Sequence, residues 1–146
     1  MRRSGSRAFP GGPGLEIAHV CTPHIGGTLI FHAYQGGRLI PVARQYGFSN
    51  HAIGSPELRL SAVADANGDG RVDLALPRAD RLGLTIITLA DGDIRAIAAV
   101  PLPARIDKAI GVLKTGGDAS FLVGLTNGQV FRIGRSRYNR AKSGEK

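Results

Sequence analysis

Short apolar runs, each ended by glycine, proline, asparagine or aspartate, are the feature that most limits the folds open to this chain. No segment keeps a helical spacing of apolar residues over about ten positions, whereas alternating patterns of about four to eight residues recur. Turn-forming pairs lie between several runs, at Gly36-Gly37, Asp91-Gly92 and Asn127-Gly128, where a hairpin would reverse. The sequence therefore predicts an all-β fold.

Strands are expected wherever a run of this kind occurs. The expected ranges are 15–21, 28–34, 38–43, 58–64, 72–76, 84–89, 94–100, 121–125 and 129–133. Glycine, at 21 of 146 residues, is about twice its usual share, which suits a chain with many tight turns.

The chain repeats itself with a spacing near 57 residues. Residues 16–18 match 73–75, residues 50–54 match 107–111, and residues 27–31 match a segment 56 positions later. A spacing of this size that holds about four strands predicts β-propeller-like blades of four antiparallel strands. The chain has room for about two to two and a half blades, whereas propellers close with about 4–8, so we expect a ring that is not closed.

One loop concentrates oxygen-bearing side chains. Asp65, Asn67, Asp69 and Asp73 occupy positions 1, 3, 5 and 9 of the segment 65–73. Calcium takes about 6–8 oxygen ligands, and alternate side chains of a tightly curled loop point to one centre. Arg71 at position 7 can offer only its backbone carbonyl. The loop therefore predicts a Ca²⁺ site, whose ion relieves the repulsion between three carboxylates.

Two alternatives compete with this site. An EF-hand begins with the same residues, but it needs a glutamate at position 12, where this chain has Leu76, and it needs flanking helices. A metal-free turn rich in aspartate and asparagine is the other alternative. Four oxygen-bearing side chains at the correct spacing favour the metal site over such a turn.

The loop also resembles the calcium-binding motif of the FG-GAP/VCBS repeat, the blade unit of integrin-type β-propellers. The family motif D-x-[DN]-G-D-G-x-x-D-[LI] is matched by Asp65, Asn67, Gly68, Asp69, Gly70, Asp73 and Leu74. The resemblance covers roughly residues 15–134 and implies metal ligation by Asp65, Asn67, Asp69, Asp73 and the carbonyl of Arg71. The other repeats depart from the motif, because the first keeps only Glu16 and the segment 115–118 has a single acid.

The resemblance implies how the chain is organised and where it acts. We expect a basic flexible tail at 1–14, an incomplete first blade at 15–57, and a complete blade at 58–104 that contains the calcium loop. A partial third blade at 105–134 and a second basic flexible tail at 135–146 follow. The family implies a periplasmic or extracellular home for the full-length protein, of which this chain would be a truncated member.

The net charge of +8 lies outside the expected blades. Residues 1–14 contribute +3 and residues 132–146 contribute +5, while the segment between them carries ten basic and ten acidic residues. Neither end shows aromatic residues or a motif that would support nucleic-acid binding, so nucleic acid is not an expected partner. No apolar run approaches the roughly 18–20 residues of a membrane span, and no apolar stretch of a secretory signal follows the first basic residues.

Two further groups of residues were weighed as sites. His19, Cys21 and His24 are potential zinc ligands, but no fourth ligand is evident, so packing is the preferred interpretation. Ser49, Ser55, His51 and Glu57 lie close in sequence without the surroundings of a catalytic nucleophile. No catalytic residue is therefore predicted.

The favoured function is a calcium-binding, non-enzymatic module used for binding or scaffolding. Its partner would be a protein or a glycan, and the exposed faces of an incomplete ring would allow self-association. The alternative is a segment of an extracellular enzyme that acts on polysaccharide, which would require a pair of carboxylates in a cleft. Glu16, Glu57 and Asp118 are the acids outside the loop that such a pair would use.

Overall fold

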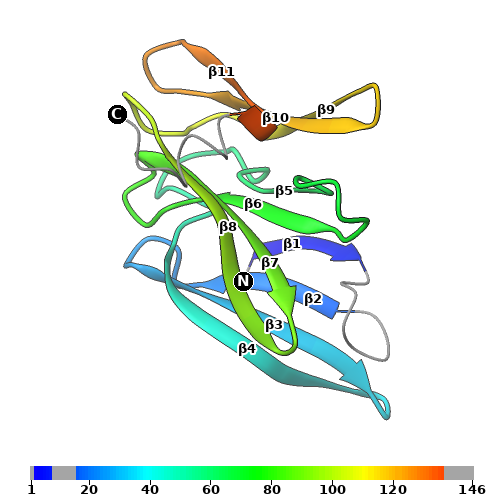
Figure 1. Cartoon of the computed structure of the whole chain (residues 1–146). Coiled ribbons are helices and arrows are strands. Elements are labelled where there is room, and N and C mark those ends of the chain that lie inside the picture. The colour runs from blue at the N-terminus through cyan, green and yellow to red at the C-terminus, as the bar shows by residue number, and fades with distance from the viewer. Residues whose placement is uncertain (1, 8–15, 137–146) are drawn as a thin grey trace.

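The computed structural model describes residues 2–7 and 16–136, and the elements that it defines there are strands arranged in three antiparallel sheets (Figure 1). The first sheet has the order β1 (Arg2–Arg7), β2 (Glu16–Cys21), β3 (Gly27–Gln35), β4 (Arg38–Phe48). The second has the order β5 (Ala62–Ala64), β6 (Asp73–Pro77), β7 (Gly83–Ala90), β8 (Asp93–Pro101). The third has the order β11 (Val130–Ile133), β10 (Asp118–Gly124), β9 (Gly111–Thr115). The predicted all-β, blade-like fold is confirmed, and none of these sheets closes on itself.

The three sheets lie in a stack, with the second between the other two (Figure 1). Successive side chains of a strand point to opposite faces, so the second sheet meets a neighbour on each side. Toward the first sheet it presents Leu74, Leu76, Ile87 and Leu89, which pack on Ala18, Val20, Leu29 and Phe31. Toward the third sheet it presents Ala75, Leu84, Ile86, Ala98 and Val100, which pack on Phe121, Val123 and Ile133. Burial on both faces explains why β6 and β7 are almost continuously apolar.

Tight turns join the strands at the positions that the glycine pairs indicated. Gly36 and Gly37 both have positive φ angles, as do Asp91 and Gly92, which is the geometry of a two-residue hairpin. Gly128 also has a positive φ angle and lies in the connection between β10 and β11. The three predicted reversals are therefore present.

The connections between sheets dock onto the next sheet in the same way twice. Phe48, at the end of β4, forms an antiparallel bridge with Arg78, just after β6. Ile106, in the connection after β8, forms an equivalent bridge with Leu125, just after β10. This repeated bridge fixes how each sheet sits on the one that follows it, and it brings the connections together at one end of the stack.

Three details differ from the expected strands. The first sheet gains a fourth strand from β1, in a segment that we assigned to a tail, whereas residues 8–14 lie outside the described residues. Strand β9 has no counterpart in the prediction, because four of its five residues are exposed and show no clear apolar alternation. The strand expected over 58–64 shortens to β5, since the prolines and charges before it belong to the connection from the first sheet.

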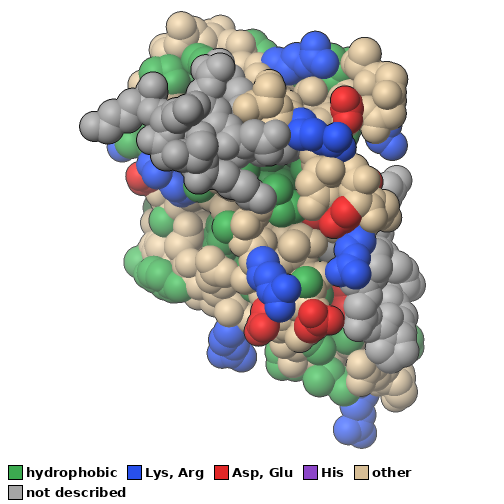
Figure 2. All heavy atoms as spheres, viewed as in Figure 1, with side chains coloured by type: hydrophobic (Ala, Val, Ile, Leu, Met, Phe, Trp, Pro, Cys, Tyr) green, Lys and Arg blue, Asp and Glu red, His purple; other side chains and the backbone are tan. Residues whose placement is uncertain are grey.

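Charged side chains of both signs are scattered over the molecule. Figure 2 shows blue and red side chains interleaved on the visible face rather than gathered in one patch. Most of the C-terminal charge, at residues 137–146, lies outside the described residues. Within the described part of the chain, no helix is long and apolar enough to cross a membrane.

We predict that the packing between the first two sheets dominates stability. Leu74 is 0% exposed, and Leu74→Ala should lower the free energy of unfolding by about 2–5 kcal/mol through lost contacts and a cavity. Val130 is 70% exposed, so Val130→Ala should change it by about 0.5 kcal/mol or less. Urea unfolding of both variants measures the difference, and similar effects would contradict the stacked arrangement.

Candidate metal centre

The predicted loop connects β5 to β6, so strands rather than helices flank it. Its first acid, Asp65, is the point around which the loop curls. Asp65 Oδ1 accepts hydrogen bonds from the backbone N–H groups of Gly68 at 2.7 Å and Asp69 at 3.2 Å. Asp65 Oδ2 accepts another from Gly70 at 2.8 Å. Both glycines have φ angles near +80°, which residues with a Cβ rarely adopt, so the sequence permits the curl.

Asn67 and Asp69 continue the same pattern on the exposed side of the loop. Asn67 Oδ1 accepts a hydrogen bond from Asp69 N at 3.0 Å, and Asp69 Oδ1 accepts one from Arg71 N at 2.8 Å. The amide of Asn67 also donates to Asp69 Oδ2 at 3.2 Å. The side chain of Arg71 is exposed, as its assigned role through the carbonyl requires.

Asp73, the last acid of the loop, differs from the others because it is 0% exposed. Its Oδ2 accepts a hydrogen bond from Ala66 N at 2.8 Å, whereas its buried Oδ1 has no hydrogen-bonding partner among the described residues. A buried carboxylate oxygen in this state is energetically costly. An oxygen-seeking cation is one way to satisfy it.

The surroundings of Asp73 raise the pKa of its carboxyl to about 6. Burial is the main cause, and the negative charges of Asp69 and Asp65 add to it. The Ala66 amide opposes the rise, as does the hydroxyl of Thr88, which lies close by but outside hydrogen-bonding geometry to Oδ1. The fold thus holds a carboxylate beside two others at an energetic penalty that a divalent cation would relieve.

The loop supplies donors of the type that calcium prefers. Its oxygens come from the side chains of Asp65, Asn67, Asp69 and Asp73 and from the carbonyl of Arg71. In the described part of the chain, however, no three His, Cys, Asp or Glu side chains meet closely enough to hold an ion as they stand. The exposed acids turn their oxygens to loop amides instead, and each such oxygen keeps a second lone pair. The donor set and the unsatisfied oxygen of Asp73 fit a calcium ion.

A contact from the far end of the chain reaches this loop. The guanidinium of Arg135 lies against Gly68, so that a Cβ at this position would collide with it. Arg135 Nη2 also forms an ion pair with Asp118 Oδ1 of the third sheet at 3.3 Å. The sequence gave no signal for this contact, because the residues are far apart along the chain. It places a positive charge beside the predicted metal loop.

The equivalent connections in the other sheets differ in length. In the third sheet, β9 and β10 are joined by Gly116 and Gly117 alone, both with positive φ angles. A two-residue hairpin cannot surround an ion, which agrees with the prediction of one competent loop. The connection between β1 and β2 lies outside the described residues.

The histidines and the cysteine divide into two separate contacts. Cys21 Sγ lies 3.3 Å from His19 Nε2 on β2, and His19 stacks on His32 with ring centroids 5.0 Å apart. Burial, followed by the charge of His32, lowers the pKa of His19. His24 instead pairs with His51, at 3.3 Å between Nε2 and Nδ1. The three residues weighed as zinc ligands are therefore not brought together.

The weighed catalytic residues do not form a nucleophile and base. Ser49 Oγ donates to the carbonyl of His51 at 3.1 Å, and His51 Nε2 lies 3.0 Å from the carbonyl of Ser55. No hydroxyl–imidazole hydrogen bond joins these residues. Hydrogen bonds from Arg59 lower the pKa of Glu57 and keep it ionised. Glu16, Glu57 and Asp118 lie on a buried strand, a connection and the third sheet respectively.

A scan against models of known protein families matches none of them, and a search of the curated proteins finds no relative. The resemblance to the FG-GAP/VCBS repeat therefore rests on the loop and on the repeated sheets.

We predict that Asp73→Asn reverses the effect of calcium on stability. Asparagine keeps the shape but removes the buried charge, so in chelator it should raise the free energy of unfolding by about 1–3 kcal/mol. In calcium the variant should lose the stabilisation that the wild type gains. Thermal melts under both conditions test this, and destabilisation in chelator would show that the charge of Asp73 is not a burden.

The same substitution isolates a pH effect. The folded pKa of Asp73, about 6, exceeds its ordinary value of 3.8, so the folded state binds the proton more tightly. In chelator this stabilisation should be complete below pH 3.8 and lost as the pH rises through 6. The difference in unfolding free energy between wild type and Asp73→Asn should therefore change across this window, and a constant difference would contradict the assigned pKa.

We also predict that Arg135 weakens calcium binding. Its charge lies beside a loop with three carboxylates, so Arg135→Gln should tighten binding by about two- to fivefold at low salt. Arg38→Gln, at the hairpin between β3 and β4, removes the same charge far from the loop and serves as the control. Calorimetric titration measures both, and equal changes would mean that only net charge matters.

Proposed function

We propose that this chain is a calcium-stabilised, non-enzymatic binding module built from FG-GAP/VCBS-type blades. The observation that carries the proposal is the curled loop between two strands, with a fully buried Asp73 oxygen that lacks a hydrogen-bonding partner among the described residues. Side chains at alternate positions of that loop supply oxygen donors, which is the chemistry that calcium requires.

The residues of the loop have distinct roles in this proposal. Asp65 holds the curl through three backbone amides, while Asn67 and Asp69 provide exposed ligands that can turn toward an ion. Asp73 anchors the site to β6 from the buried side. A bound calcium ion would supply positive charge that offsets the repulsion between the acids. The loop would then tie β5 and β6 together more firmly.

Linkage gives the size of the effect. A ligand that binds only the folded state at about 100 times its dissociation constant stabilises it by about 2.7 kcal/mol. Extracellular calcium modules bind with dissociation constants of about 10⁻⁴–10⁻³ M, which suits the periplasmic or extracellular location that the resemblance implies. The stacked sheets would serve as a scaffold for a protein or glycan partner, or for further copies of the chain.

Calorimetric titration with calcium tests the proposal. We expect one site per chain, together with a clear fall in melting temperature when a chelator removes the ion. Asp69→Ala should abolish both effects because it removes a ligand. Arg71→Ala should leave binding almost intact, since Arg71 contributes only its carbonyl. Equal losses in the two variants would refute the ligand assignment, and the absence of any heat of binding would refute the metal site.

A further inference from the structure

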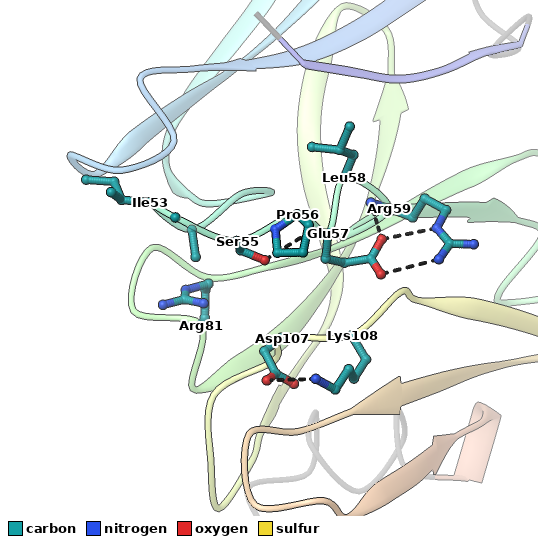
Figure 3. A pocket seen from close by; sticks show the side chains of 11 residues that line it. Ile53, Ser55, Pro56, Glu57, Leu58, Arg59, Arg81, Asp107 and Lys108 are labelled. Carbon is teal, nitrogen blue, oxygen red and sulfur yellow. Dashed lines mark hydrogen bonds and ion pairs between the residues drawn. The ribbon is translucent and has the colours of Figure 1, made fainter.

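A groove lies at the end of the sheets opposite to the metal loop. Strand β6 begins at Asp73 of the loop, and the turn that follows it, at residues 78–82, borders the groove. Two hollows make it up, one of about 860 Å³ and one of about 370 Å³. They share the side chains of Ala52, Ile53 and Arg81, so they adjoin at this point. Figure 3 shows the larger hollow between the connection from the first sheet and the residues around Asp107.

The acids that line the groove are already paired with basic neighbours. Glu57 accepts hydrogen bonds from Arg59, and Asp107 pairs with Lys108 at 3.3 Å (Figure 3). Asp80, in the smaller hollow, pairs with Arg78 at 3.0 Å. These ion pairs leave no lining carboxylate to neutralise a further cation.

Two arginines of the groove lack such partners. Arg81 donates one long hydrogen bond, from Nη1 to the carbonyl of Ile106 at 3.5 Å. Arg105 is exposed, and its side chain forms no hydrogen bond or ion pair within the described residues. The groove therefore has surplus positive charge and free donors that suit planar carboxylates.

The backbone holds Arg81 in place before any ligand arrives. Its φ angle is +58°, which is unusual for a residue with a side chain. Its N–H donates to the carbonyl of Arg78, and its own carbonyl accepts from Ile106 N, both at 2.9 Å. Strain that surrounding bonds maintain is a feature of ligand sites.

The remaining lining distinguishes between classes of anionic partner. Ile53 is 80% exposed and Leu58 is 48% exposed, so the groove offers aliphatic surface beside its cations. No Phe, Tyr or Trp is among the residues that line either hollow, whereas sugar rings commonly pack on such aromatic faces. Aliphatic and acidic side chains of an extended peptide match this lining better than a glycan does.

We propose that the groove binds an extended acidic peptide segment of a partner protein. Its carboxylates would pair with Arg81 and Arg105, and its aliphatic side chains would contact Ile53 and Leu58. The inference rests on the proposed binding role but not on the metal, since the two sites lie at opposite ends of β6.

Fluorescence anisotropy with a labelled peptide of alternating glutamate and leucine tests the inference, with glutamine in place of glutamate as the neutral control. The acidic peptide should bind and the neutral one should not. Arg105→Gln should weaken binding about five- to tenfold, because it removes charge-assisted hydrogen bonds. Arg38→Gln makes the same charge change away from the groove and should leave binding within about twofold.

Other results would overturn the inference. Equal losses in Arg105→Gln and Arg38→Gln would mean that the peptide senses net charge alone. Equal binding of the two peptides would remove the role of the carboxylates, and tighter binding of a sulfated polysaccharide that depends on Arg105 would assign the groove to a glycan. Measurements in calcium and in chelator, below the melting temperature of each form, separate this site from the metal loop. Peptide binding without a heat of calcium binding would leave the groove standing and refute only the metal site.

Discussion

The second sheet sets the terms for the whole structure because both of its faces are apolar. Leu74 and Leu76 face the first sheet, and Ala75 between them faces the third, all with no exposed surface. One sheet cannot bury two faces by itself, so a stack of at least three sheets is the smallest arrangement that satisfies it. The docking of the connections at Phe48 and Ile106 follows from this stacking.

The first sheet does not repeat this pattern on its outer face. By strand register, His19 and His32 take the places that Leu76 and Ile87 hold in the second sheet. Imidazole rings can meet both apolar neighbours and water, so this face has the mixed polarity of a terminal repeat rather than of an interior one. The stack is therefore not a simple series of identical layers.

Sequence reasoning found most strands because their apolar runs are short and end in turn residues. It missed β1 because the segment Arg2–Arg7 has no apolar residue. The repeat was aligned one position off in the third strand, since Ala18 pairs with Phe31 whereas Ala75 pairs with Ile86, which is two residues nearer. The oxygen donors of the loop were readable from spacing alone. The burial of Asp73 and the contact of Arg135 with Gly68 were not, because both depend on how the sheets stack.

Strand β6 links the two ends of the molecule that carry its chemistry. It begins with the buried Asp73 and ends just before the turn that presents Arg81. With only five residues, all of them buried, it transmits position rather than flexing, because tightly packed interiors deform little. Neutralising Asp73 secures the register between β5 and β6, and the same register fixes where the turn at residues 78–82 begins. The charge state of one buried carboxylate therefore bears on how firmly the groove at the other end of the strand is held.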